Sequence, residues 1–264
     1  MRSLARATGI DPTTLIGKGS GGRVTRADMR AASGAGAHLD RDEVIPFDNI
    51  RRRTAAGLLA SKGTIPHALA VVAADYSAVD AARRPERLTA LAFVARAVID
   101  ALREYPRLNA TTAADGQSVV LHRAVHLGIA VDLDFEGLVV PVVHDADGMR
   151  LRALAAAIRE VAARAHARKL APDDLAGGTF TITNPGASRT WISFPVINRP
   201  QVGILATDGV SKEVVAGADG HLAIAPIGRL CCSFDHRVLD GAYAGAFLQR
   251  VREIVETRDW LSEL

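Results

Sequence analysis

The chain has 264 residues, of which 48% are hydrophobic and 23% are charged, and its formal net charge is +3 at pH 7. This is the composition of a globular protein, and the length allows one large and one small domain. So small a net charge does not by itself indicate nucleic-acid binding, and we do not expect nucleic acid as a partner. No apolar run reaches the roughly 18 residues of a membrane span, and no charged-then-apolar leader opens the chain, so we expect a cytoplasmic protein without a membrane segment.

The first 32 residues are rich in Arg, Thr and Gly and carry a net charge of +4. Their charged side chains are Arg2, Arg6, Lys18, Arg23, Arg26 and Arg30 against Asp11 and Asp28. A positive unit of this size can steer an acidic protein partner to residues 2–32. A solvated surface without a partner is the alternative. Phosphate binding is a third interpretation, although aromatic residues for base stacking are absent.

A glycine pattern and a helix start stand out in this unit. Gly17, Gly19 and Gly22 spell GxGxxG, but no strand precedes them and no βαβ unit surrounds them, so a dinucleotide site is excluded. Thr25 is predicted to cap a helix, with Asp28 completing an acidic form of the capping box. Residues 33–43 have the composition of a flexible linker. We therefore predict a small domain at 1–32, a linker at 33–43 and a large domain at 44–264.

The large domain alternates predicted helices and strands and contains no internal repeat. Helices are predicted at 49–62, 88–104, 151–165 and 242–255, and Pro106 ends the second of them. Strands are predicted at 67–76, 125–133, 138–143, 179–183, 202–207 and 222–234. The segment 134–137 between two of these strands has the composition of a hairpin turn. This interleaving favours a mixed sheet with packed helices over a doubly wound parallel sheet.

The two cysteines, Cys231 and Cys232, are adjacent on a predicted strand. Neighbouring strand residues point to opposite faces, so a disulfide between them is not expected. We expect small core residues in a reducing cytoplasm. No spacing of Cys and His suits a structural metal, and we expect no metal.

The segment from Ser233 to Gly241 carries the strongest functional signal in the chain. His236 lies four residues before Asp240 and five before Gly241, after the longest apolar strand and before a predicted helix. An imidazole at the end of a buried strand is well placed to act as a base. A lone histidine in apolar surroundings is more often structural, and the chain has eight, so this motif alone leaves both interpretations open.

The HxxxDG pattern resembles the signature of the chloramphenicol acetyltransferase and dihydrolipoyl acyltransferase (E2) superfamily, and the longer DHRxxDG resembles its E2 branch. Further blocks match E2 catalytic domains in order and spacing: Ile45-Pro46 with residues 50–52, 65–67, 106–110, 137–143, 177–184 and 197–201. The resemblance implies an α/β (α+β) fold with a chloramphenicol-acetyltransferase-like mixed sheet and packed helices. Residues 4–11 and 17–28 resemble the peripheral subunit-binding domain of the same proteins, which implies a small helical domain in front.

The resemblance implies acyl transfer from a thioester, with coenzyme A (acyl-CoA) as a substrate. His236 would act as the general base that removes a proton from the attacking thiol or hydroxyl. The Thr183 hydroxyl would donate a hydrogen bond to the oxyanion of the tetrahedral intermediate. No covalent acyl-enzyme is needed, because both substrates can meet at the base.

Asp240 is the third predicted catalytic residue, and Arg51, Arg52 and Asn184 are expected to support the site. The resemblance implies a structural ion pair between Asp240 and Arg51 or Arg52, and direct proton chemistry by Asp240 is the alternative. Asn184 follows the predicted oxyanion donor and would support it. Family precedent implies a homotrimer or a larger assembly, in which CoA and a small-molecule acceptor enter a channel between subunits from opposite ends.

The chain also departs from the E2 pattern. E2 chains normally begin with lipoyl domains, and nothing similar stands here, so we expect no lipoyl group on this chain. The loops at 132–136 and 187–191 also differ from the family pattern. We therefore predict a freestanding CoA-dependent acyltransferase that moves an acetyl or other short acyl group to a small hydroxyl or thiol compound, for instance in a tetronate-like natural-product pathway. Two alternatives are the E2 core of a 2-oxoacid dehydrogenase complex and a non-catalytic assembly scaffold. The intact His236, Thr183 and Asp240 argue against the scaffold.

Overall fold

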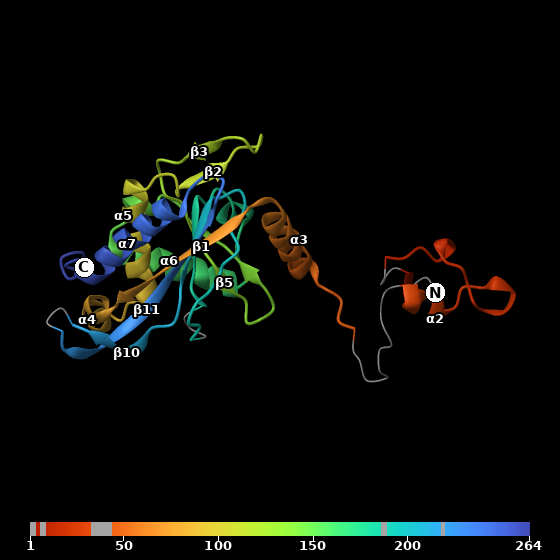
Figure 1. The fold of residues 1–264 in the computed structure, drawn as a ribbon, viewed down its shortest axis with the longest axis horizontal. Helices are drawn as coiled ribbons and strands as arrows, with labels where there is room; N and C mark the ends of the chain where they lie inside the picture. The colour runs from red at the N-terminus through yellow and green to blue at the C-terminus, as the bar shows by residue number, and fades with distance from the viewer. Residues whose placement is uncertain (1–3, 6–8, 33–43, 186–188, 218–219) are drawn as a thin grey trace. The chain divides into compact units, whose positions relative to one another are not determined.

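The computed structural model describes residues 4–5, 9–32, 44–185, 189–217 and 220–264 (Figure 1). It divides into two compact units, Met1–Asn49 and Ile50–Leu264, and each is considered by itself. Within these described ranges, no helix combines the length and the apolar character needed to cross a membrane.

The N-terminal unit contains short helical segments joined by turns. They are η1 (Pro12–Thr14), η2 (Ser20–Gly22) and α2 (Arg26–Ala32). The predicted capping box is confirmed: the Thr25 N–H donates to Asp28 Oδ2 at 2.8 Å, and the Asp28 N–H donates to Thr25 Oγ1 at 3.2 Å. Asp28 Oδ2 also accepts from the Lys18 N–H at 3.1 Å, which ties the glycine loop to the start of α2. Within the segment 4–11 that resembles the subunit-binding domain, residues 6–8 lie outside the described residues.

The glycines of the GxGxxG pattern are explained by backbone packing. A Cβ atom at Gly17 would lie 2.3 Å from the carbonyl carbon of Arg23, so only glycine allows this approach. Gly21 and Gly22 have φ angles of 70° and 75°, in the left-handed region that favours glycine. The pattern therefore forms a tight loop in front of α2.

The large unit is built on a mixed sheet, as predicted. Its strands are β1 (His67–Asp75), β4 (Leu127–Ile129), β7 (Val142–Val143), β8 (Phe180–Thr183), β9 (Gly203–Thr207), β10 (Ser211–Ala216) and β11 (Leu222–Asp235). Their order is β1-β11-β9-β8-β4-β7, and β10 pairs with β11. Strand β8 runs parallel to both β9 and β4, and the other pairs are antiparallel.

The predicted hairpin around residues 134–137 is present but divided between two sheets. Leu127 of β4 pairs with Val143 of β7, whereas β5 (Val131–Asp132) pairs with β6 (Leu138–Val139) in a separate small sheet. Pro141 lies between β6 and β7 and accepts from the Ile129 N–H at 2.8 Å. Because proline has no N–H to return a hydrogen bond, the ladder is interrupted there. A second small hairpin, β2 (Ala110–Thr112) with β3 (Val119–Leu121), was not predicted.

The helices of the large unit are α3 (Asn49–Thr64), α4 (Ser77–Glu86), α5 (Ala90–Glu104), α6 (Leu151–His166) and α7 (Gly241–Thr257), with short 3-10 turns η3 (Ala146–Gly148) and η4 (Pro172–Leu175). Helices α4 to α7 gather on one side of the sheet, α7 lies against β1 and α5, and α3 lies apart near the start of β1 (Figure 1). Helix α4 escaped prediction because only Val79 and Ala82 of it are buried and Pro85 lies within it.

The main hydrophobic core of the described residues fills the space between these helices and the sheet, and Ile65, Ile197 and Ile204 form a second, small cluster. Its largest fully buried side chains include Trp260, Tyr76, Phe93, Phe180, Phe234 and Phe247. Cys231 and Cys232 are free and buried on β11, as predicted. Burial raises the pKa of each thiol to about 12, so both remain protonated at neutral pH.

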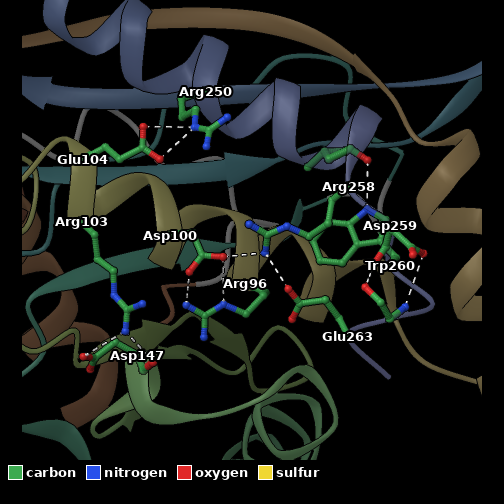
Figure 2. Close-up of polar contacts among 12 residues, drawn as sticks. Arg96, Asp100, Arg103, Glu104, Asp147, Arg250, Arg258, Asp259, Trp260 and Glu263 are labelled. Atoms are coloured by element: carbon green, nitrogen blue, oxygen red, sulfur yellow. Dashed lines mark hydrogen bonds and ion pairs between the residues drawn. The ribbon is translucent and has the colours of Figure 1, made fainter.

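An ionic network ties the C-terminal segment to α5 (Figure 2). Arg96 is almost fully buried and donates to Asp100 Oδ1 at 2.5 Å and to the Met149 carbonyl at 2.8 Å. Arg258 donates to the other oxygen of Asp100 at 2.6 Å, and its guanidinium lies 5.2 Å from the ring centre of Trp260. Two cations therefore share one carboxylate at the junction of α5 with the end of the chain.

Candidate active site

His236 lies immediately after β11, where the strand turns toward α7. Its N–H donates to the Pro66 carbonyl at 3.1 Å, and its ring lies 5.5 Å from that of Phe234 between centres. Half of its side chain is exposed. The backbone is therefore anchored while the imidazole remains accessible to a substrate, as a general base requires.

Asp235 and Arg237 hold the turn that presents this histidine. The Asp235 carboxylate is fully buried and accepts from Arg237 Nε at 2.9 Å, from Arg237 Nη2 at 2.5 Å and from the Arg237 N–H at 3.0 Å. The hydrogen bonds that Arg237 donates to Asp235 raise the pKa of the Arg237 guanidinium, so this side chain stays charged. The two neighbours of His236 in the chain, one on each side, thus hold its backbone in place. Asp235 and Arg237 both belong to the DHR part of the motif, but the sequence analysis gave them no role, because residue types alone do not show that they pair.

Asp240 begins α7 as its N-cap residue. Its side chain is 90% exposed, and its Oδ1 lies 3.9 Å from His236 Nδ1, too far for a hydrogen bond. Arg51 Nη2 donates to the Phe135 carbonyl at 3.2 Å, on the β5–β6 hairpin. The pairing of Asp240 with Arg51 or Arg52 stays a prediction, and the described geometry places the aspartate beside the imidazole.

Thr183 is the last residue of β8 and is half-buried at the wall of a cavity of about 400 Å³. The lining side chains are largely aliphatic and include Leu58, Leu138, Val140, Val196, Ile197 and Ile204. Arg53, Asn198 and Arg199 add polar atoms. Asn184 follows Thr183 but lines a different cavity, which it shares with Tyr76 and Asp208. A hydroxyl at an apolar wall can donate to a carbonyl oxygen where water competes little.

The fold places His236 and Thr183 at opposite ends of the sheet. Phe234 pairs with Gly203 on β9, whereas Thr183 pairs with Ala206 of the same strand. His236 follows Phe234 by two residues, so the register separates it from Thr183 by roughly 17 Å along the strands and about 10 Å across them. One chain therefore does not bring the predicted base and the predicted oxyanion donor to the same thioester group.

His67, next to this turn on β1, was not singled out from the sequence. Its Nδ1 lies 2.9 Å from the Ile65 carbonyl, and its Nε2 accepts from the Ile197 N–H at 3.1 Å. These contacts require a neutral ring with its proton on Nδ1, and they occupy both nitrogens. His67 is thus a structural histidine that fixes the segment ending at Ile197. Within the described residues, no group of His, Cys, Asp and Glu side chains is arranged to hold a metal ion.

Comparison with known protein families matches both parts of the chain. The model of the 2-oxoacid dehydrogenases acyltransferase (catalytic domain) matches residues 40–262, and that of the e3 binding domain matches residues 2–30. The lipoamide acyltransferase component of the branched-chain alpha-keto acid dehydrogenase complex of Bacillus subtilis is 32% identical over 97% of this chain and 70% of its own length. The dihydrolipoyllysine-residue acetyltransferase component of the pyruvate dehydrogenase complex of Mycobacterium tuberculosis is 42% identical over 67% of this chain and 32% of its own length.

Solved structures agree with these matches. A probable dihydrolipoamide acetyltransferase from Listeria monocytogenes has a TM-score of 0.74 and 35% identity, covering 82% of this chain and 95% of its own. The dihydrolipoamide acetyltransferase of Azotobacter vinelandii has a TM-score of 0.79 and 29% identity, covering 83% and 95%. A chloramphenicol acetyltransferase, at 12% identity and a TM-score of 0.51 over 81% of this chain and 99% of its own, shares the fold alone.

These matches correct the predicted function. The prediction of a freestanding natural-product acetyltransferase is wrong, because the chain joins an E2-type catalytic domain to an e3 binding domain and resembles components of 2-oxoacid dehydrogenase complexes. The same matches bear out the acyltransferase prediction and the predicted fold. The chain spans between about a third and 70% of the length of the two relatives described. It is an acyltransferase that belongs to the E2 family of the 2-oxoacid dehydrogenase complexes.

Proposed function

We propose that this chain is the dihydrolipoyl acyltransferase core of a 2-oxoacid dehydrogenase complex, which transfers an acyl group between a dihydrolipoyl thiol and coenzyme A. The observation that carries the proposal is a histidine held half-exposed at the end of β11 by the Asp235–Arg237 pair. It stands in a chain whose similarity to E2 components extends over nearly its whole length. The Azotobacter vinelandii relative was studied for the catalytic roles of a serine, a histidine and an asparagine, and the last two are four positions apart, as are His236 and Asp240.

The chemistry follows from the two predicted site residues. A nitrogen of neutral His236 removes the proton of the attacking thiol as its sulfur bonds to the thioester carbonyl carbon. The carbonyl oxygen becomes an oxyanion and accepts a hydrogen bond from Thr183 Oγ1. When the tetrahedral intermediate collapses, the bond to the departing sulfur breaks, and the imidazolium returns its proton to that sulfur. The number of thioesters is unchanged, and the enzyme is regenerated without a covalent intermediate.

The separation of His236 from Thr183 supports an active site made by two chains. A ring of identical subunits joined head to tail brings one end of each sheet to the opposite end of its neighbour. In a homotrimer of this kind, His236 of one chain meets Thr183 of the next, and each ring holds one site per interface. Coenzyme A and the dihydrolipoyl thiol would approach this site from different sides.

The cavity beside Thr183 supports an assignment for the acyl group. When the carbonyl oxygen accepts from Thr183, the acyl chain starts within a few ångströms of this hydroxyl. The aliphatic side chains around it, such as Leu138, Val140 and Val196, would surround the acyl carbons. A short aliphatic acyl group, acetyl or branched, therefore fits this wall.

Residues 2–30 would dock another component of the complex. The family model there is that of an e3 binding domain, and the unit carries a net charge of +4. Opposite charge on a partner surface would accelerate the encounter and fix its orientation. An acidic face on the lipoamide dehydrogenase component would be the complementary partner.

The experiment that tests the proposal compares acceptors. Acyl-CoA turnover is measured with dihydrolipoamide and, in parallel, with small hydroxyl compounds at equal concentration. We expect a preference for dihydrolipoamide of at least about a hundredfold, since a thiolate attacks a thioester far more readily than an alcohol held by the same base. Absence of turnover with dihydrolipoamide, or an equal rate with hydroxyl compounds, would contradict the proposal.

A further inference from the structure

Asp208 is a buried carboxylate that the proposed chemistry does not use. It follows β9 directly and is only 2% exposed. Ala206, two residues earlier, pairs with Thr183, so Asp208 lies at the same end of the sheet as the predicted oxyanion donor. A buried charge is costly unless hydrogen bonds compensate for its lost hydration, so its contacts show what it holds.

The donors around this carboxylate come mainly from one loop. Oδ1 accepts from Thr190 Oγ1 at 2.7 Å and from Ser193 Oγ at 2.6 Å. Oδ2 accepts from the Ser193 N–H at 3.1 Å and from Cys231 Sγ at 3.2 Å. Both oxygens thus act only as acceptors, the pattern of an ionised carboxylate. The raised pKa of Cys231 keeps its thiol protonated and able to donate.

The same loop continues into the wall of the cavity beside Thr183. Pro195, Val196 and Ile197 line that cavity, and they follow Ser193 closely in the chain. At the far end of this short segment, the Ile197 N–H donates to His67, and its carbonyl accepts from Ser61 Oγ at 2.7 Å. The wall therefore runs between two anchors, the buried Asp208 at its start and the part-buried His67 at its end.

The anchor at Asp208 also holds the loop backbone. The N–H of Gly209, the next residue, donates to the Thr190 carbonyl at 2.8 Å. A Cβ atom at Gly209 would lie 3.1 Å from this carbonyl oxygen and 3.1 Å from the Arg189 Cα, so the two chain segments are in close contact. Loss of the carboxylate would release the start of the wall while the His67 anchor keeps its end in place.

We propose that Asp208 is a positioning residue for acyl transfer. Its carboxylate accepts hydrogen bonds from Thr190 and Ser193 and so holds the Pro195–Ile197 wall opposite Thr183. The position of this wall determines which short acyl groups the cavity accepts. The proposal rests on the proposed function, because it takes this cavity as the acyl site. Asp208 acts through the wall and touches no reacting atom.

The kinetic test uses Asp208→Asn and the pair Thr190→Val and Thr190→Ser in the full chain. The asparagine keeps the shape but directs an NH2 group at hydroxyl and N–H donors, whereas serine at 190 retains the hydroxyl that valine lacks. With dihydrolipoamide as acceptor, kcat/KM is measured for acetyl-CoA and isobutyryl-CoA. We expect the ratio of the two values to change by about tenfold in Asp208→Asn and by about threefold in Thr190→Val, because a shift of the wall of under an ångström alters the fit of the acyl group.

Matched variants separate positioning from general damage. Thr190→Ser should keep the wild-type ratio, as should Glu160→Gln on the exposed surface of α6, where the side chain is 73% exposed. The pH dependence of kcat should also be unchanged in Asp208→Asn, because Asp208 acts through the wall and the base, His236, is left unaltered. An unchanged acyl-CoA ratio in a folded Asp208→Asn protein would overturn the proposal. If that variant does not fold, equal ratios for Thr190→Val and Thr190→Ser would overturn it instead.

A second readout is independent of activity. The chain has two tryptophans, Trp191 in the loop that Asp208 holds and the buried Trp260. Trp260→Phe therefore leaves one tryptophan, whose fluorescence reports on this loop alone. In this background, the anisotropy decay of Trp191 should gain a fast nanosecond component in Asp208→Asn and Thr190→Val but not in Thr190→Ser. If the wild-type protein turns over no acyl-CoA, the proposed function fails, and the anisotropy still decides whether Asp208 holds this loop in place. An anisotropy decay of Trp191 in Asp208→Asn that equals that of the wild type would show that Asp208 does not hold the loop.

Discussion

At the scale of single residues, the site depends on how one imidazole is presented. His236 sits between the members of the Asp235–Arg237 pair, and its own N–H is bound to the Pro66 carbonyl. These contacts fix the backbone and leave the ring half-exposed. Removing the ring should therefore affect the reaction and leave the fold intact.

His236→Ala is expected to lower kcat with dihydrolipoamide and acyl-CoA by roughly two to four decades, the usual contribution of a general base. The melting temperature should change by less than about a degree, because the lost side chain is half-exposed and alanine keeps the backbone N–H that binds the Pro66 carbonyl. Steady-state kinetics and thermal unfolding on the same preparations check both parts. A variant with near wild-type kcat would show that His236 is a structural residue.

Thr183 should behave as an oxyanion donor. Thr183→Ala is expected to lower kcat by about a hundredfold or more while the KM for acyl-CoA changes little, because the hydrogen bond strengthens only when charge develops on the oxygen. Thr183→Ser keeps the hydroxyl and should retain most of the activity. Equal losses in the two variants would indicate that the threonine methyl group, and so packing, is what matters.

At the scale of elements, the junction of α5 with the C-terminal segment depends on one shared carboxylate. Burial tends to raise the pKa of Asp100, but hydrogen bonds from Arg96 and Arg258 outweigh it and hold the pKa below the ordinary 3.8 (Figure 2). A carboxyl group with a depressed native pKa stabilises the fold above its unfolded pKa, and this contribution is lost as the pH falls toward the native value.

Asp100→Asn should therefore destabilise the protein most at neutral pH. The expected loss is about 3 kcal/mol, since the almost fully buried Arg96 loses its counter-charge. Thermal unfolding at a series of pH values checks this: the difference in melting temperature from wild type should be largest near pH 7 and should shrink as the pH falls below about 4. Glu160→Gln serves as the exposed control. A difference that stays constant with pH would mean that charge at Asp100 contributes nothing to the junction.

At the scale of the whole molecule, the sheet separates the two predicted site residues by its own length. Thr183 lies at one end of β8, and His236 follows the opposite end of β11. Complementation between inactive chains tests whether neighbours share a site. His236→Ala and Thr183→Ala chains are coexpressed in equal amounts with different affinity tags, and mixed oligomers are purified.

Mixed oligomers should regain activity, because some interfaces pair the intact His236 of one chain with the intact Thr183 of another. A mixed ring of three chains has one such interface in three, so about a third of the wild-type kcat should return. The separate variants mixed after purification, without subunit exchange, provide the baseline. Mixed oligomers that remain at this baseline would argue that each chain contains its own complete site.

Much of the fold was predictable because its long elements have strong local patterns. The apolar spacing of α5 and α6 and the continuous apolar run of β11 identify their elements without tertiary information. Helix α4 was missed because it buries few side chains, and the small β2–β3 hairpin because its second strand is exposed. The split of the 125–143 hairpin follows from Pro141, whose missing N–H matters only once the partner strand is known.

By itself, the sequence determined the family, the mixed α/β architecture and the identities of the predicted base and oxyanion donor, since these depend on residue types at fixed spacings. It led to the wrong prediction of a freestanding natural-product enzyme, because the absence of a motif was given more weight than the retained subunit-binding unit. Only the tertiary structure decided that His236 and Thr183 lie apart, that Asp235 holds Arg237 beside the base, and that Asp208 reaches Thr190 and Ser193. Strand order and register set these distances, and both arise from contacts between segments far apart in the chain.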